Sequence, residues 1–151
     1  MTETTQPLAD LHALFGYRDA PAAITWLQRA FGFETTMSYP DEKGGIAHSE
    51  LRLGDAVVVV FSDHDGYERP PRKGPTMGYG VYLSVPAPDD VDALYARAVD
   101  AGATTIWKPE STEWGNYRFR VVDPEGFEWS FGVHRPGEPQ DEWTEDEQQA
   151  T

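Results

Sequence analysis

The chain repeats one order of secondary structure twice, and this repeat restricts the possible folds more than any other feature of its sequence. In each half, a short strand-like run precedes a segment in which apolar residues recur at helical spacing, and three further strand-like runs follow. The helical segments are 19–32 and 89–102, and the later strand-like runs are 34–39, 45–53, 56–61, 104–108, 116–122 and 127–133. The sequence therefore predicts two βαβββ modules, at about 8–61 and 78–136, in one domain of residues 1–136.

The residues at the helix ends support this division. Asp19 precedes the first helical segment as a suitable N-cap, and Asp89 or Asp90 is the expected cap of the second. Gly32 and Gly102 follow the last apolar residue of each segment, where glycine commonly ends a helix.

Two segments lie outside the modules. Residues 62–77 are rich in Gly and Pro and are predicted to form an exposed linker. Residues 137–151 contain six acidic residues and no Lys or Arg, a composition typical of a disordered tail.

Composition excludes several functions. The formal net charge of −14 disfavours contact with a phosphate backbone, so nucleic acid is not an expected partner. The chain has no Cys, which rules out disulfides and thiolate metal sites. No apolar run approaches the roughly 20 residues needed to cross a bilayer, and the N-terminus does not resemble a signal peptide, so we expect a cytoplasmic protein without membrane contact.

The repeat also suggests where a ligand would bind. Each module has one helix, which can cover one face of its sheet, and the other face cannot remain a wide apolar surface in water. Two such sheets, from one chain or from two, can enclose a concave space suited to a small molecule. The predicted fold class is therefore α+β, with two βαβββ modules forming a curved mixed sheet around a cavity.

Four stretches carry a resemblance to a known family: HALFGYRDAPAAITWLQRAFGFE, SELRLGDAVVVVFS, GVYLSVPAPDDVDALYARAVDAGA and EWGNYRFRVVDPEGFEWSFG. Over residues 12–134 the chain resembles the vicinal oxygen chelate superfamily, which includes glyoxalase I, bleomycin-resistance proteins and ring-cleaving dioxygenases. The resemblance implies paired βαβββ modules around a funnel-shaped pocket. Because many members are dimers, it also implies a homodimer.

Metal-dependent members of that superfamily hold an ion with four ligands, usually His, Glu, His and Glu. The corresponding positions here are His12, Val59, Gly80 and Ser130, so only the first carries a good ligand. Catalytic sites for ions such as Zn²⁺ need about three protein ligands. The resemblance therefore implies a member without a metal cofactor.

A displaced metal site remains an alternative. His48 and Glu50 alternate on one predicted strand, and Glu128 lies two residues from Ser130. Together with His12, these side chains could supply ligands at a shifted position.

Alternation along each strand predicts which side chains share the pocket with the four family positions. Apolar neighbours such as Val57 would join them, and a loop at 109–118 would add aromatic and basic groups. The expected ligand pocket consists of His12, Val59, Phe61, Tyr82, Trp114, Arg118, Glu128 and Ser130.

A structural role is the alternative for several of these residues. His12 could hydrogen-bond to backbone, Tyr82 could simply pack in a wall, and Trp114 could pack against its own loop. Arg118 and Arg120 could pair with the abundant carboxylates.

Two functions follow from the resemblance. The first is a binding protein that sequesters an aromatic or cationic drug or metabolite without a metal, as in antibiotic resistance. The second is an enzyme, either a metal-dependent lyase, isomerase or dioxygenase, or a metal-free one with Glu128 or His12 as general base.

Overall fold

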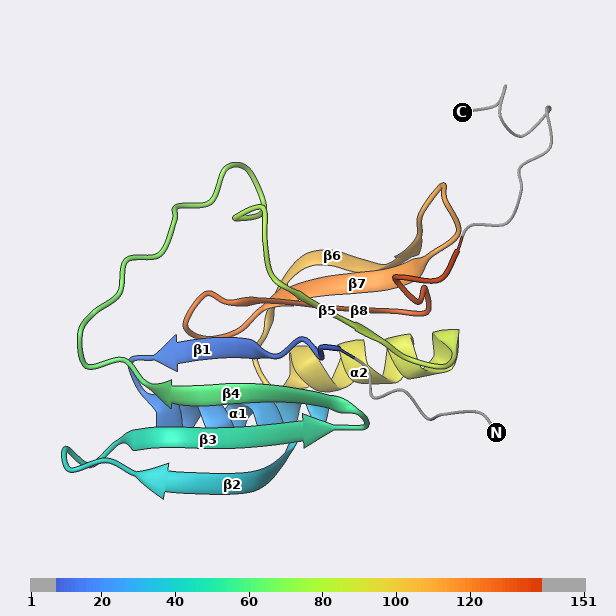
Figure 1. Ribbon diagram of the computed structural model, residues 1–151. Coiled ribbons are helices and arrows are strands. Elements are labelled where there is room, and N and C mark those ends of the chain that lie inside the picture. The colour runs from blue at the N-terminus through green and yellow to red at the C-terminus, as the bar shows by residue number, and fades with distance from the viewer. Residues whose placement is uncertain (1–7, 140–151) are drawn as a thin grey trace, which may run out of the picture.

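The computed structural model describes residues 8–139 and confirms the predicted α+β class, with two helices and two four-stranded mixed sheets (Figure 1). The first half contains β1 (Ala13–Tyr17), α1 (Ala20–Phe31), β2 (Glu34–Pro40), β3 (Ile46–Leu53) and β4 (Ala56–Ser62). The second half contains β5 (Val81–Ser84), α2 (Pro88–Asp100), β6 (Thr104–Ser111), β7 (Tyr117–Val122) and β8 (Glu128–Gly132). Most of the predicted acidic tail lies outside the described residues.

The two sheets have the same topology, as the repeat in the sequence requires. Their strand orders are β1-β4-β3-β2 and β5-β8-β7-β6, with the first strand of each half parallel to the fourth. The parallel pair needs a long crossover, which the helix and the two intervening strands provide. The remaining pairs are antiparallel hairpins.

The helix ends follow local rules, with one departure from expectation. The Asp19 carboxylate accepts a hydrogen bond from the Ala22 N–H at 3.1 Å, which caps α1 as predicted. Helix α2 begins earlier than expected, because Pro88 occupies its first turn and Ala87 is the N-cap. Asp90 still contributes to this end, since its side chain accepts the Ala87 N–H at 3.0 Å. Neither helix of residues 8–139 is long and apolar enough to cross a membrane.

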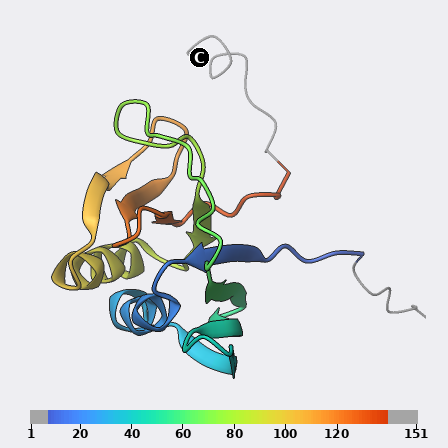
Figure 2. The same cartoon turned by 90° about the vertical axis from the view of Figure 1, so that its left-hand side faces the viewer.

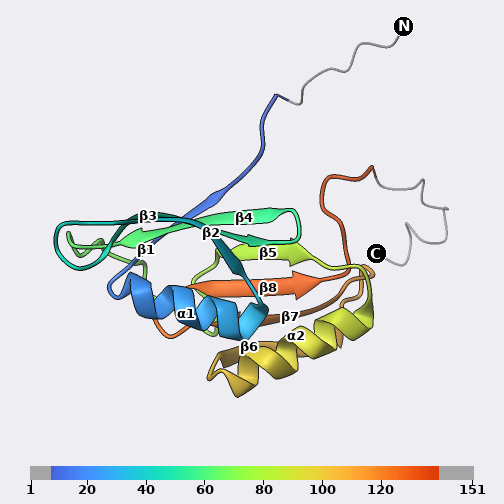
Figure 3. The same cartoon turned by 90° about the horizontal axis from the view of Figure 1, so that it is seen from below.

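Both helices lie on one side of the molecule and share one core with the inner faces of the sheets (Figures 2 and 3). The centre of the Phe31 ring of α1 lies 5.4 Å from the ring centre of Trp129 and 4.9 Å from that of Phe131, both on β8. The first helix therefore packs on a strand of the second half. Helix α2 contacts α1 directly, because Arg97 Nε donates to the Arg29 carbonyl at 2.7 Å.

The turn between β7 and β8 fastens the second half to the start of α1. Asp123 is buried, and its Oδ2 accepts hydrogen bonds from Tyr17 Oη at 2.5 Å and from Trp129 Nε1 at 3.1 Å. The Glu125 carboxylate accepts the backbone N–H groups of Arg18 and Asp19 at 2.7 and 2.9 Å, just before the helix. Burial raises the pKa values of both the Tyr17 hydroxyl and the Asp123 carboxyl.

Because the helices cover only one face of each sheet, two faces remain. We call the face of the first sheet opposite α1 the N-face, and the face of the second sheet opposite α2 the C-face. Their assignment follows from alternation in the central strands: Val58 and Val60 are buried on the helix side of β4, and Phe119 and Val121 on the helix side of β7.

Candidate functional site

The N-face is largely apolar and open. One row of cross-strand neighbours runs over the four strands of this sheet. From β1 to β2 it consists of Leu14, Val59, Glu50 and Met37. Leu14 is 70% exposed and Met37 40%, although both are large apolar side chains on regular strands. The next row places Phe61 beside Gly16. Exposed apolar side chains on β1, β2 and β4 are typical of a binding or interaction surface, and the row is polar only where it crosses β3 at Glu50.

A histidine and a carboxylate interrupt the apolar N-face. His48 Nε2 lies 2.7 Å from Glu50 Oε2, and both side chains are partly exposed on β3. Tyr39 of β2 is the cross-strand neighbour of His48. The hydrogen bond holds the imidazole beside the carboxylate on the open face of the sheet.

The C-face carries polar groups instead. Tyr82 of β5 is the cross-strand neighbour of Ser130 of β8, and its hydroxyl donates to the His134 carbonyl at 2.8 Å. Burial raises the pKa of the Tyr82 hydroxyl. Gly132 leaves room for this arrangement, since a Cβ there would meet Tyr82 Oη at 2.6 Å and Asn116 Oδ1 at 2.7 Å.

The linker covers part of the C-face. Glu128 is buried, and its carboxylate accepts a hydrogen bond from Thr76 Oγ1 at 2.5 Å and another from the Met77 N–H at 2.7 Å. Arg120 Nη1 lies 3.3 Å from the same carboxylate. Glu128 thus holds the end of the linker and a neighbouring arginine.

Two arginines and a tryptophan occupy the rest of the C-face. The guanidinium carbons of Arg118 and Arg120 lie 5.0 and 4.9 Å from the centre of the Trp107 ring. Arg120 Nε donates to Ser130 Oγ at 2.6 Å, and Arg118 Nη1 lies 3.3 Å from a Glu110 oxygen. Both arginines pair with carboxylates, Arg118 with Glu110 and Arg120 with Glu128, which is the alternative that the sequence left open.

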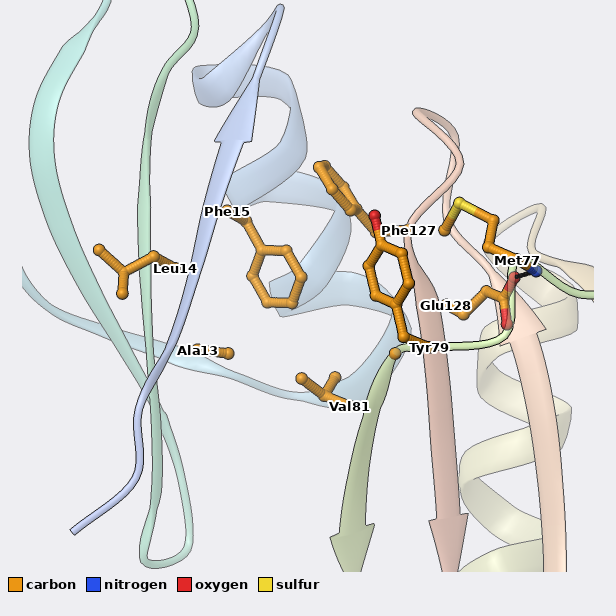
Figure 4. Close-up of a pocket in the computed structure, with 9 residues that line it drawn as sticks. Ala13, Leu14, Phe15, Met77, Tyr79, Val81, Phe127 and Glu128 are labelled. Carbon is orange, nitrogen blue, oxygen red and sulfur yellow. Dashed lines mark hydrogen bonds between the residues drawn. The ribbon is translucent and has the colours of Figure 1, made fainter. Parts of the chain in front are cut away.

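A small apolar groove of about 290 Å³ lies between β1 and the start of β5. Figure 4 shows the Phe15 side chain reaching from β1 toward Phe127 and Tyr79, with Leu14 directed away. The two phenyl rings are in edge contact, with centres 5.0 Å apart. The groove therefore belongs to the junction of the two modules, and Glu128 is the one predicted pocket residue that lines it.

The predicted pocket residues fall into two groups within one chain. Val59 and Phe61 lie on the N-face, whereas Tyr82, Arg118, Glu128 and Ser130 lie on the C-face.

The two other predicted pocket residues lie outside the central strands. His12 precedes β1 and is exposed, with Nδ1 3.1 Å from the Val57 carbonyl, so it contacts backbone. Trp114 is 65% exposed in the loop before β7, and its ring meets His134 edge to face at 5.0 Å.

The sequence reasoning missed Trp107 and treated Arg120 only as a partner for carboxylates. Alternation in the run YRFRVV was the available signal, because it places Arg118 and Arg120 on the same face. No comparable signal existed for Trp107, since β6 contains register shifts on both sides of this residue.

The four positions that hold a metal in related enzymes do not fit a divalent ion here. Val59 offers no donor atom, and the Ser130 hydroxyl already accepts from a cationic arginine. A side chain at Gly80 would meet the Glu128 backbone oxygen at 2.8 Å, so no ligand could be placed there without movement. Within residues 8–139, no three His, Asp or Glu side chains gather closely enough to hold an ion.

Two βαβββ modules packed side by side on a shared helical layer define a recognisable class of α+β proteins. The chain belongs to the Glyoxalase/Bleomycin resistance protein/Dioxygenase superfamily, whose family model matches residues 11–131. An uncharacterised protein of Mycobacterium bovis is 32% identical over 118 residues, which cover 76% of this chain and 76% of the relative.

Solved structures agree with this assignment. TioX from Micromonospora sp. ML1 is similar with a TM-score of 0.63 and 28% identity, over 84% of this chain and 99% of TioX. The fosfomycin resistance protein FosX from Listeria monocytogenes, solved with Mn(II) and sulfate, has a TM-score of 0.63 at 14% identity, over 95% of this chain and 99% of FosX. The likeness to FosX concerns the fold alone.

Proposed function

We propose that this protein binds a small aromatic molecule without a metal ion, in a site formed between the N-face of one copy and the C-face of a second. The observation that carries the proposal is the uncovered apolar N-face, with Leu14 70% exposed and Val59 and Phe61 beside it. An apolar wall with a few polar groups opposite it is the usual composition of a small-molecule site.

The need for a second copy follows from the shared core. Both helices are used on the inner faces of the sheets, so neither helix of the same chain can cover the N-face. A twofold dimer in which each N-face meets the partner's C-face would cover both faces and create two equal sites. The partner's Tyr82 and Trp107 would then complete a site with Val59.

We propose binding without a metal ion because the side chains at the family's metal-binding positions cannot ligate one. Three of the four family positions carry Val59, Gly80 and Ser130, and none of these provides an imidazole or a carboxylate. Binding alone can protect a cell, because a protein in excess over its ligand lowers the free concentration by mass action. Sequestration of an aromatic toxin or antibiotic is the role that such binding would serve.

The quaternary part of the proposal is tested by sedimentation velocity on matched variants. We expect Val59→Asp to shift the protein from dimer to monomer while its far-UV circular dichroism stays native, because the charge is placed on the N-face; its melting temperature should fall, since dissociation removes the stabilisation that association provides. Val99→Asp makes the same change at a 45% exposed position on α2 and should leave the dimer intact. A monomeric wild type, or an undisturbed Val59→Asp dimer, would contradict the arrangement.

The binding part is tested by isothermal titration calorimetry with 2-naphthamide, a neutral aromatic probe, together with metal analysis of protein purified without chelators. We expect saturable binding and less than stoichiometric divalent metal. A stoichiometric ion, or no binding of any naphthalene derivative at millimolar concentration, would contradict the proposal.

A metal-free enzyme is the second candidate, and the His48–Glu50 contact favours it. A carboxylate 2.7 Å from an imidazole can orient it as a general base, and the pair lies on the proposed ligand face. Chemical change of a bound molecule, detected by mass spectrometry in the wild type and lost in His48→Gln, would support catalysis. Unchanged recovery of every bound ligand would favour the binding role.

A further inference from the structure

The C-face contains two guanidinium groups whose hydrogen-bonding capacity is only partly used. Arg118 and Arg120 have side chains that are 18% and 22% exposed, so both cations are largely removed from bulk water. A guanidinium has five N–H donors and cannot be deprotonated in a protein. Among residues 8–139, the one buried side-chain nitrogen or oxygen without a partner is Arg69 Nε, so the unpaired N–H groups of Arg118 and Arg120 keep access to solvent and can reach a ligand.

The contacts of Arg120 fix its position and leave one side free. Its Nε donates to Ser130 Oγ at 2.6 Å, and its Nη1 lies 3.3 Å from Glu128 Oε1 and 3.4 Å from Thr76 Oγ1. In the part of the chain that the structure describes, Nη2 has no acceptor within hydrogen-bonding distance. The contact with Glu128, at 3.3 Å, is longer than the 2.7–2.9 Å usual for a charge-assisted hydrogen bond, and that carboxylate also accepts two hydrogen bonds from the linker.

Arg118 is similarly available. Within residues 8–139, its one ion pair joins Nη1 to Glu110 Oε1 at 3.3 Å, and Glu110 is itself half exposed. Among residues 8–139, the Nε and Nη2 groups of Arg118 meet no acceptor. Because Arg118 and Arg120 alternate on β7, their free donors lie on the same face of the sheet.

Trp107 places the two cations beside an aromatic side chain. Both guanidinium groups lie about 5 Å from its ring centre, which keeps their planes beside an apolar surface. We propose that the C-face recognises the carboxylate of a planar aromatic acid through the free N–H groups of Arg120 and Arg118, with the ring of the acid lying against apolar side chains. The inference rests on the proposed binding function and names its ligand class.

An anionic ligand is the opposite of the cationic ligand that the net negative charge of the protein would favour. A net charge of −14 favours cations at long range, but exposed charges beyond roughly 8 Å are largely screened at physiological salt. Recognition at contact depends on the groups that touch the ligand. On the C-face those groups are guanidinium donors, since Glu128 is already occupied by the linker.

The test compares 2-naphthoate with 2-naphthamide, which differ in charge but hardly in shape, by isothermal titration calorimetry. We expect the wild type to bind naphthoate at least about tenfold more tightly than naphthamide, since hydrogen bonds to charged groups contribute about 1.5–3 kcal/mol. Added NaCl should weaken naphthoate binding only. A third probe, 2-naphthylmethylamine, carries the opposite charge and should bind least tightly.

Matched variants assign the effect to the arginines. Arg120→Gln should lower naphthoate affinity more than naphthamide affinity and so remove the naphthoate preference, whereas Arg72→Gln removes the same charge from an exposed linker position and should leave the preference intact. Arg120→Lys keeps the charge but loses the planar fork, and should restore less than half of the preference in free energy. If Arg120→Gln melts at a markedly lower temperature, Arg118→Gln provides the same comparison.

The outcomes separate the two proposals. Equal affinity for naphthoate and naphthamide, or equal behaviour of Arg120→Gln and Arg72→Gln, would overturn the aromatic-acid inference and leave the binding function standing. Binding of 2-naphthylmethylamine in preference to naphthoate would overturn it in favour of cationic ligands. Failure of all three probes to bind would overturn both proposals.

Discussion

Replacement of Asp123 by Asn tests how the two halves of the chain are held together. In the folded protein, Oδ1 accepts the N–H groups of Glu125 and Phe127, each at 3.0 Å. Oδ2 accepts from Tyr17 Oη at 2.5 Å and from Trp129 Nε1 at 3.1 Å. Four donors from three parts of the structure therefore converge on one carboxylate.

Asparagine keeps the size of the side chain but has one oxygen instead of two. If its oxygen faces the two backbone amides, its NH₂ group faces Tyr17 and Trp129. The tyrosine hydroxyl can rotate to become an acceptor, but an indole N–H is only a donor and loses its partner. A buried unsatisfied donor costs about 1–3 kcal/mol, so we expect the variant to lose about 2 kcal/mol of stability. For a chain of this size that corresponds to a fall of about 4–8 °C in melting temperature.

The pH dependence of the difference gives a second test. Burial raises the pKa of the Asp123 carboxyl, so the folded state binds its proton more tightly than the unfolded chain does. The resulting stabilisation is fully present below the unfolded pKa and is lost as pH rises through the folded pKa. Because Asn does not titrate, the advantage of the wild type over Asp123→Asn should be largest in acid and smaller at neutral pH.

Urea unfolding at several pH values, followed by tryptophan fluorescence, measures both effects. Asp55→Asn is the matched control, since Asp55 lies exposed in the turn between β3 and β4. A loss below about 0.5 kcal/mol in Asp123→Asn, the size usual for surface substitutions, would refute this account of the junction. An advantage of the wild type that grows as pH rises would refute the account of the carboxyl.

Three further predictions concern other contacts. Glu125→Ala removes the acceptor of two N–H groups before α1, and thermal unfolding should show a loss of about 1–2 kcal/mol, with a loss below 0.5 arguing against a capping role. Gly80→Ala places a Cβ 2.8 Å from the Glu128 carbonyl oxygen, so urea unfolding should show a loss of about 1–3 kcal/mol in stability. An unchanged urea midpoint would mean that the backbone at Gly80 moves easily away from β8. The hydrogen bond from His64 lowers the pKa of Asp41, so Asp41 stabilises the fold above its unfolded pKa and loses this effect as pH falls through its folded pKa. Asp41→Asn should therefore melt earlier than the wild type at neutral pH but not in strong acid, and a constant difference across pH would exclude titration as the cause.

Much of the fold could be predicted because it depends on local patterns. Apolar residues at helical spacing, a capping aspartate and a terminal glycine set the extent of the first helix at both ends. Alternation in AVVVVF placed Val57 and Phe61 on the same face as Val59, and the structure buries the intervening Val58 and Val60 on the helix side. Prediction was poorer where local signals compete, as at the start of α2, where Pro88 preceded both expected caps.

The candidate site was only partly predictable, because its residues come together through tertiary contacts. Nothing local to Glu128 indicates that linker residues would occupy its carboxylate, as Thr76 and Met77 do. The contact of Trp107 with two arginines depends on the irregular register between β6 and β7. Such features require the relative placement of segments that are distant in the sequence.

By itself the sequence determined the repeated module, the helix and strand faces and the lack of metal-binding side chains at Val59, Gly80 and Ser130, because these depend on residue type and spacing. Only the tertiary structure decided that both helices share one core, that the N-face stays uncovered and that Arg118 and Arg120 gather around Trp107. The physical reason is that alternation assigns a side chain to one face of a strand, whereas the packing of the whole chain decides what that face meets.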